Sequence, residues 1–409
     1  GAIGRATDGN RHGKFKYAPP SGYLALCTDN INEPVIGPNS DTRAINHFGT
    51  LTYTGNATND TNIVSGGSGI GGEISFTPDW LWIKRRGGSN SHVVQDSLRG
   101  SGSNDSMLIL LPNDGGAELN LNDHVRSFDT NGFTLDDDAG TTVATNDSGS
   151  GQTYVAWCWN GGTNTANDAS STSIGSRDST FQANTIAGFS MVTYTGDGGT
   201  AIDTYRHGLQ VNGVATTPEL IICKNRQTTD DWLFGATAIP SFNWANDYMH
   251  WNEPEEHKTD ASRSAFSVAP TSTVFSVGEF LNKANNYVAY LFASVEGYSR
   301  IGTFKGNGAD SGRFIHLGFR PAWVMIKAVS GVTGQYWCIF DNVRDPSNDQ
   351  ASQVLFVNAG DAEGTGGIDI DFLSNGMKMR DTGNNHNSSS GVYIYMAFAE
   401  APFKYANAR

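Results

Sequence analysis

Three short segments of the chain repeat one pattern, in which a proline opens an apolar run and a lysine closes it six residues later. The segments are PDWLWIK from Pro78, PELIICK from Pro218 and PAWVMIK from Pro321. Apolar runs of this length with punctuated ends indicate buried strands. Three copies of about 100 residues indicate repeated units of the size of a β-sandwich, because solenoid repeats are only about 20 to 50 residues long.

Each copy places the same neighbours around this strand. A strand ending in a glycine turn precedes it and an apolar strand closes the copy. The opening strands are LTYTGN from Leu51, MVTYTGDG from Met191 and IGTFKGNG from Ile301, and the closing strands are YVAWCW from Tyr154, YVAYLF from Tyr287 and YIYMAF from Tyr393. With 49 glycines, 17% charged residues and no long amphipathic helical stripe, the chain favours short strands joined by turns. The sequence therefore predicts an all-β fold of three concatenated β-sandwich or jelly-roll units.

The predicted organisation has five parts. They are an extended N-terminal arm or the end of a preceding module at 1–46, a first sandwich at 47–162, a polar linker at 163–186, a second sandwich at 187–298 and a third sandwich at 299–409. Pro19 and Pro20 interrupt regular strand pairing in the arm. The linker prediction rests on a run rich in Asn, Ser and Thr between the first two copies.

Charge, hydropathy and cysteine spacing argue against nucleic-acid binding, membrane insertion and a CxxC motif. The net charge is −14 and the basic residues form no run, so an electrostatic footprint for nucleic acid is missing. No stretch approaches the roughly 18 apolar residues of a membrane helix, so no membrane insertion is predicted. The four cysteines, Cys27, Cys158, Cys223 and Cys338, are too far apart for a CxxC motif and are predicted to be free thiols.

Clusters of acidic residues offer little catalytic chemistry. They occur at 136–138, at 253–256, and at Asp369 and Asp371. Neighbours on a strand alternate faces, so adjacency alone does not give the carboxyl separation of a glycosidase. No catalytic residue, metal site or cofactor is predicted, although oxygen ligands at alternating positions leave calcium as an alternative. Asp and Arg recur three residues apart, at 96 and 99 and at 341 and 344, where a structural ion pair is expected.

One segment of the second copy is the candidate binding surface. It runs from Trp244 to Asp260, WANDYMHWNEPEEHKTD, and it has no evident counterpart in the other copies. Trp244, Tyr248 and Trp251 could form an aromatic platform for a sugar ring, with Glu253 beside it. We expect this segment to be exposed and to bind a ligand or another subunit. The alternative is that the three rings belong to the core of the second sandwich.

The motifs resemble a repeated domain of virion proteins of tailed bacteriophages, especially those of marine bacteria and cyanobacteria. The residues that carry the resemblance are the YTG turns, the proline-to-lysine strands, DSLRG from Asp96, NGF from Asn131, YVAWCW from Tyr154 and AFAEAPFKYANAR from Ala397. The segment from Lys14 to Pro34 is similar to the stretch that follows SPRY-like lectin modules in such proteins. The second copy departs most from the pattern, since it lacks DSLRG.

The resemblance implies a lectin-like, non-enzymatic virion protein, such as a tail fibre or similar appendage, that binds a host surface glycan or receptor. Its expected partners are other virion proteins, the host receptor and further copies of itself, with a trimer as one option. Its expected location is the virion, assembled in the host cytoplasm. Two alternatives remain open: a capsid decoration or head-fibre protein with purely structural contacts, and a tail-spike glycan depolymerase.

Overall fold

Strands dominate the structure, a computed structural model that describes residues 6–25, 27–31, 33–37, 42–102, 107–138, 143–147, 151–260, 264–347 and 351–406. Within these ranges the helices are α1 (Ala169–Thr172), η1 (Thr28–Asn30), η2 (Ala44–Asn46) and η4 (Glu279–Leu281). None of these described helices has the length and apolar character needed to cross a membrane. The predicted all-β fold is confirmed.

The first unit, residues 47–162, is a sandwich of two antiparallel sheets. Its strands are β1 (Phe48–Thr54), β2 (Thr61–Val64), β3 (Gly71–Gly72), β4 (Trp80–Arg85), β5 (Val93–Asp96), β6 (Val125–Asp129), β7 (Gly132–Leu135) and β8 (Thr153–Trp159). One sheet has the order β3-β1-β8-β4-β5 and the other the order β2-β7-β6. Leu81, Phe133 and Ala156 are among the buried side chains that form the core of this unit.

The second unit, residues 163–298, contains a large sheet and two small ones. Its strands are β9 (Thr163–Asn167), β10 (Ser179–Asn184), β11 (Phe189–Thr195), β12 (Asp203–Arg206), β13 (Gln210–Val211), β14 (Val214–Ala215), β15 (Leu220–Asn225), β16 (Leu233–Ala236), β17 (Asp247–His250), β18 (Lys258–Thr259), β19 (Val274–Val277) and β20 (Asn286–Phe292). The large sheet has the order β18-β17-β16-β15-β20-β11-β10-β9, and β12 pairs with β19 and β13 with β14.

The predicted linker at 163–186 is wrong, because β9 and β10 extend this large sheet. β10 pairs with β11 over its whole length, from Ser179 opposite Tyr194 to Asn184 opposite Phe189. The threonines of this polar run have β-branched side chains that suit a strand, so a polar composition did not exclude pairing.

The third unit, residues 299–406, is built from one sheet of eight strands. They are β21 (Ser299–Lys305), β22 (Phe314–His316), β23 (Phe319–Ser330), β24 (Cys338–Asp341), β25 (Ala351–Phe356), β26 (Gly364–Leu373), β27 (Gly376–Met379) and β28 (Val392–Pro402). Their order is β21-β28-β23-β24-β25-β26-β27-β22. Side chains from both halves of this order, such as Ile326 and Phe372, share one core, so the sheet closes on itself as a sandwich.

The three proline-to-lysine segments occupy equivalent strands, as predicted. Each pairs with the strand that closes its unit, and the lysine lies at the same place in the register. Lys84 is opposite Val155, Lys224 is opposite Val288 and Lys327 is opposite Ile394. The four strands that contain this pairing have the same order in every unit: β1-β8-β4-β5, β11-β20-β15-β16 and β21-β28-β23-β24.

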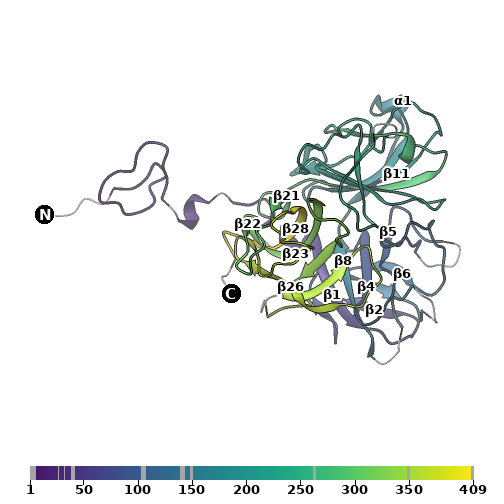
Figure 1. Cartoon of the computed structure of the whole chain (residues 1–409), viewed down its shortest axis with the longest axis horizontal. Coiled ribbons are helices and arrows are strands. Elements are labelled where there is room, and N and C mark those ends of the chain that lie inside the picture. The colour runs from purple at the N-terminus through teal and green to yellow at the C-terminus, as the bar shows by residue number, and fades with distance from the viewer. Residues whose placement is uncertain are drawn as a thin grey trace.

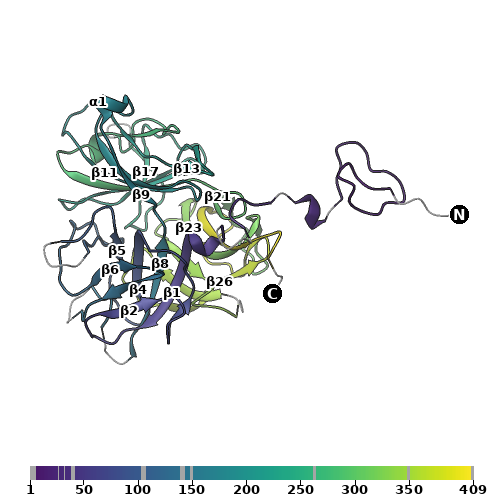
Figure 2. The same cartoon turned by 180° about the vertical axis from the view of Figure 1, so that it is seen from behind.

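These four-stranded sheets are buried on both faces. In β8, Tyr154, Ala156 and Cys158 point into the core of the first unit, and the alternate residues Val155, Trp157 and Trp159 enter a second core. All three units share this second core, the central core, which includes Trp80, Trp82, Trp157, Trp159, Trp232, Trp251, Tyr290, Trp323, Trp337 and Phe398. The units lie against one another around it (Figures 1 and 2). Each large side chain buried there contributes about 1.5 to 3 kcal/mol, so the units stabilise one another.

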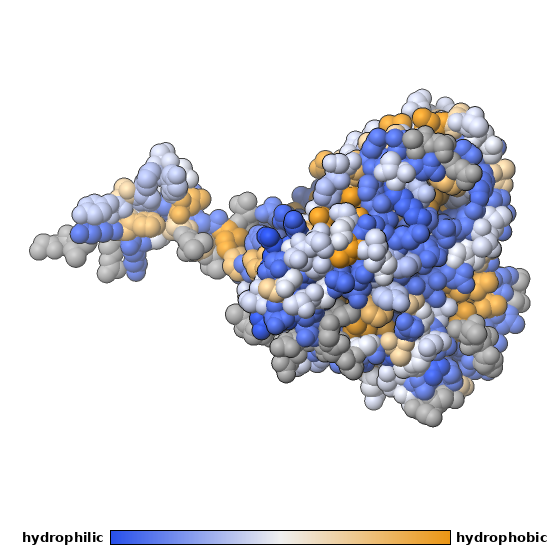
Figure 3. Space-filling view, in the orientation of Figure 1, coloured by the Kyte–Doolittle hydropathy of each residue, from blue (hydrophilic) through white to orange (hydrophobic). Residues whose placement is uncertain are grey.

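The N-terminal arm extends away from the three units (Figure 1). Within it, the Asp8 carboxylate accepts hydrogen bonds from the backbone of Asn10, His12 and Ala25. The arm is attached where Ile36, only 1% exposed, enters the central core. In the space-filling view, polar residues predominate on the visible face of the body, and apolar residues form scattered patches there and on the arm (Figure 3).

Candidate functional site

The predicted binding segment of the second unit is buried, so the expectation that it is exposed is wrong. Trp244 is 6% exposed, Tyr248 is 8% exposed and Trp251 is 0% exposed. Trp244 and Tyr248 pack in the core of the second unit, while Trp251 enters the central core and contacts Trp82 of the first unit edge to face. Glu253, two residues after Trp251, is half-buried. The three rings therefore stabilise the body and do not form an open platform for a sugar.

This segment also has counterparts in the other two units. The side-chain oxygens of Asn113, Asn252 and Asn358 each accept a hydrogen bond from the backbone at the start of the neighbouring strand, from His92, Trp232 and Trp337 respectively. Asn252 therefore occupies the same structural position as Asn113 and Asn358. The three spacings are nearly equal, at 21, 20 and 21 residues, so it is the different composition of the three loops that conceals this equivalence in the sequence.

The three repeated lysines join the units in a cycle. We call the contact between two units a joint. The Nζ of Lys84 donates to the carbonyl of Gly360 in the third unit, at 3.2 Å, and that of Lys224 donates to Gly115 in the first unit, at 3.1 Å. The Nζ of Lys327 donates to Pro254 in the second unit, at 2.9 Å. These carbonyls each lie two residues after the equivalent asparagines, so the three units are related by an approximate threefold symmetry.

The same lysines are buried and lack a carboxylate within hydrogen-bonding distance among the described residues. Each also donates to a carbonyl of its own unit, at 2.8 Å, namely Arg85, Asn225 and Gln335. Burial penalises the charged form and lowers the pKa of Lys84, Lys224 and Lys327 to about 8.

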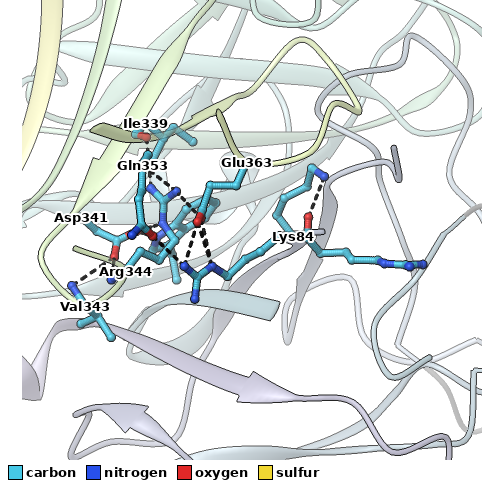
Figure 4. A network of polar contacts seen from close by, with 10 residues as sticks. Lys84, Ile339, Asp341, Val343, Arg344, Gln353 and Glu363 are labelled. Atoms are coloured by element: carbon cyan, nitrogen blue, oxygen red, sulfur yellow. Dashed lines mark hydrogen bonds and ion pairs between the residues drawn. The ribbon is translucent and has the colours of Figure 1, made fainter. Parts of the chain in front are cut away.

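An ionic network lies at the joint between the third and first units (Figure 4). Arg344 pairs with Asp341 at 2.5 Å and with Glu363 at 3.0 Å. Arg86 of the first unit reaches the same Glu363 at 2.7 Å. The indole nitrogen of Trp157, also from the first unit, donates to Asp341 at 3.0 Å. Burial alone would lower the pKa of Arg344, but the two carboxylates overcome this and raise it.

The joint between the first and second units repeats this network. Arg99 pairs with Asp96 at 2.5 Å and with Glu118 at 2.8 Å. Arg226 of the second unit pairs with Glu118 at 2.8 Å, and the hydroxyl of Tyr290 donates to Asp96 at 2.6 Å. The predicted structural ion pairs at 96 and 99 and at 341 and 344 are thus confirmed, and each connects two units.

The joint between the second and third units has the same backbone hydrogen bond as the other two joints, but apolar residues stand in place of the Asp–Arg pair. The backbone of His257 donates to Val329, as Glu118 does to Arg226 and Glu363 does to Arg86. By register, Ala236 and Ile239 take the places of the Asp and the Arg. Ala236, Ile239 and Val329 all belong to the central core. Because Ala236 and Ile239 replace both members of the buried Asp–Arg pair, neither charge of that pair is left buried without its counter-ion.

Sequence reasoning missed Arg86, Glu118, Arg226 and Glu363. One signal was present, since Arg86 and Arg226 each follow a repeated lysine by two residues, where the third copy has Val329. The two glutamates lie in loops of different sequence. A signal was present here too, since Glu118 and Glu363 each follow the repeated arginine, Arg99 or Arg344, by 19 residues.

Two surface grooves could receive a ligand. A groove of about 620 Å³ lies on the second unit, between Asp168, Asp178 and Arg177 on one side and Arg226 and Asn286 on the other. A second groove, of about 740 Å³, lies where the arm meets the second and third units, and Pro34, Leu317 and Phe403 line it. Among the described residues, no group of three or more His, Cys, Asp or Glu side chains could hold a metal ion.

The fold and joints define an all-β protein in which three fused sandwiches share one core. The chain belongs to the family described as a domain of unknown function, DUF7483, whose model matches residues 43–402. The match spans all three units as one domain. No curated protein and no solved structure matches the chain.

Proposed function

We propose that this chain is a non-enzymatic adhesion component of a tailed-phage virion, carried on an appendage, which binds a glycan or receptor on the host surface. The observation that carries the proposal is the body of three units fixed around a common core and held on a projecting arm. A body whose units cannot move independently presents its surface loops in a fixed arrangement, which lowers the entropy lost on binding.

The most deeply buried charged groups support a binding role over a catalytic one. Arg99 and Arg344, whose side chains are 0% exposed, are engaged by carboxylates within the joints. A catalytic group needs access to a substrate, whereas these groups connect one unit to the next. The resemblance of the repeats to phage virion domains supports the location, and copies of the chain assembled with other virion proteins would present several binding surfaces at once.

The proposal is tested by locating the chain on the particle and measuring its effect on adsorption. Immunogold labelling of assembled virions should place the chain on the tail, and the purified chain should compete with virions for adsorption to host cells. Labelling of the capsid without competition would favour a decoration or head-fibre protein. Release of reducing sugar from the host glycan would favour a depolymerase, and virions without the chain would overturn the proposal.

A further inference from the structure

The segment β9–α1–β10 breaks the threefold similarity of the units. In the first unit the edge strand next to β1 is β3, which has two residues, and in the third unit β21 itself is the edge of the sheet. In the second unit β10 and β9 continue the sheet beyond β11. The first four residues of β9 are exposed, so this strand adds little to either core. Because this segment lies outside the framework that the three units share, its surface can serve ligand binding without affecting the joints or the central core.

The groove of about 620 Å³ is formed by this addition, and its volume lies within the usual range for ligand sites. The floor is the face of β10 and β11 that contains Thr180 and Thr193, which are paired across the two strands. Neither hydroxyl makes a hydrogen bond within the described part of the chain. Both side chains are only half-buried, so their hydroxyls are accessible.

The charged groups around this floor are already held in place by other residues. Asp168 accepts hydrogen bonds from the hydroxyls of Ser170 and Ser171, at 2.7 and 2.8 Å. Arg177 is paired with Asp203 at 3.1 Å, and Arg226 is paired with Glu118 across the joint to the first unit. Fixed side chains lose little entropy when a ligand binds.

The chemistry of the lining indicates a neutral, hydroxyl-rich ligand. Two carboxylates, Asp168 and Asp178, and two guanidinium groups, Arg177 and Arg226, line the groove. Asp203 and Glu118 already neutralise the guanidinium groups, so the groove has no excess of positive charge that would favour an anionic ligand. Arginine and amide groups donate hydrogen bonds, carboxylates accept them, and threonine hydroxyls do both. A sugar hydroxyl can likewise donate and accept, whereas a phosphate would be repelled by the like charges of Asp168 and Asp178.

We propose that this groove on the second unit binds a neutral oligosaccharide, with Thr180 and Thr193 as its floor and Asp178 and Asn286 as hydrogen-bonding partners at its sides. The inference rests on the proposed adhesion function and assigns the ligand to a place on the chain. It replaces the aromatic segment at 244–260 as the candidate binding surface.

The test fills the groove without removing any contact that holds the body together. Thr193→Trp projects a large side chain over the floor, and Thr193→Ser keeps the hydroxyl. The matched control is Thr303→Trp, because Thr303 occupies the same register position in the third unit, opposite Ile394 as Thr193 is opposite Val288. The probes are an array of neutral and acidic bacterial surface oligosaccharides and, separately, intact host cells.

We expect the wild-type chain and the Thr303→Trp and Thr193→Ser variants to bind the same neutral oligosaccharides. We expect Thr193→Trp to bind them at least about tenfold more weakly, a change that corresponds to about 1.4 kcal/mol. Equal glycan binding by Thr193→Trp, or binding of acidic glycans alone, would overturn the groove assignment. In the first case, retained adhesion to host cells would leave the adhesion function intact. A wild-type chain that binds neither the array nor host cells would contradict both proposals.

Discussion

Replacing Glu363 with Gln tests the ionic network between the third and first units. The substitution keeps the shape of the side chain and removes its charge, so Arg86 and Arg344 lose a shared carboxylate. Glu363 is 9% exposed and Arg344 is 0% exposed, so water cannot replace that interaction fully. Removing one partner of a buried ion pair typically costs about 3 to 5 kcal/mol. Since Arg86 is 23% exposed and the amide oxygen still accepts one hydrogen bond, we expect a loss of about 2 to 3 kcal/mol.

Equilibrium unfolding in urea, followed by tryptophan fluorescence, measures this loss, because the tryptophans of the central core report on the joints. The equivalent positions supply matched controls. Glu118→Gln should lose a similar amount at the joint between the first and second units. His257→Gln should lose less than about 1 kcal/mol, since that residue makes only a partly exposed ion pair with Asp247. A loss below about 0.5 kcal/mol for Glu363→Gln, or an equal loss at all three positions, would refute the reasoning.

Three further predictions concern the buried groups. Trp251→Ala should lower the free energy of unfolding by about 3 to 5 kcal/mol, because the ring is 0% exposed in the central core, and an unchanged urea midpoint would contradict this packing role. Burial lowers the pKa of Lys327 from 10.5 to about 8, so between pH 8 and 10.5 the unfolded state binds more protons than the folded state. The free energy of unfolding of the wild-type chain, relative to that of a Lys327→Met variant, should therefore rise with pH in that window. Urea titrations at pH 7.5 and 9.5, with the exposed Lys305→Met as control, would show a constant difference if the reasoning is wrong. In the native protein a thiol reagent should modify the half-exposed Cys27 and spare Cys158, Cys223 and Cys338, whose burial raises their pKa, and modification of two or more thiols per native chain would contradict this.

The sequence was sufficient for the fold class, the repeated strand and the free cysteines. It was also sufficient for the equivalence of Lys84, Lys224 and Lys327, because the proline and lysine mark the register directly. The central core was within reach but was missed. In segments such as WLWI, from Trp80 to Ile83, every residue is apolar, which indicates a strand buried on both faces, and a single sandwich can bury only one of them. The other face of such a strand must therefore be buried against another unit, as it is in the central core.

The errors have a common physical cause. Whether a polar segment is exposed or buried, and whether it forms a strand, depends on the parts of the chain that pack against it, which its own composition does not reveal. Trp244 and Trp251 were read as exposed because they lie among acidic and polar residues, yet the strand β17 directs side chains of this segment into two cores. The polar run at 163–186 was read as a linker because it is rich in Asn, Ser and Thr. The free edge of β11 provided the backbone hydrogen bonds that turned it into strands.

Differential scanning calorimetry of the chain tests most directly whether the three units form one body. The shared core and the cyclic joints predict that the units unfold together, in one transition whose calorimetric and van't Hoff enthalpies agree. Two or three separate transitions, or a calorimetric enthalpy several times the van't Hoff enthalpy, would mean that each sandwich unfolds alone and would contradict the account.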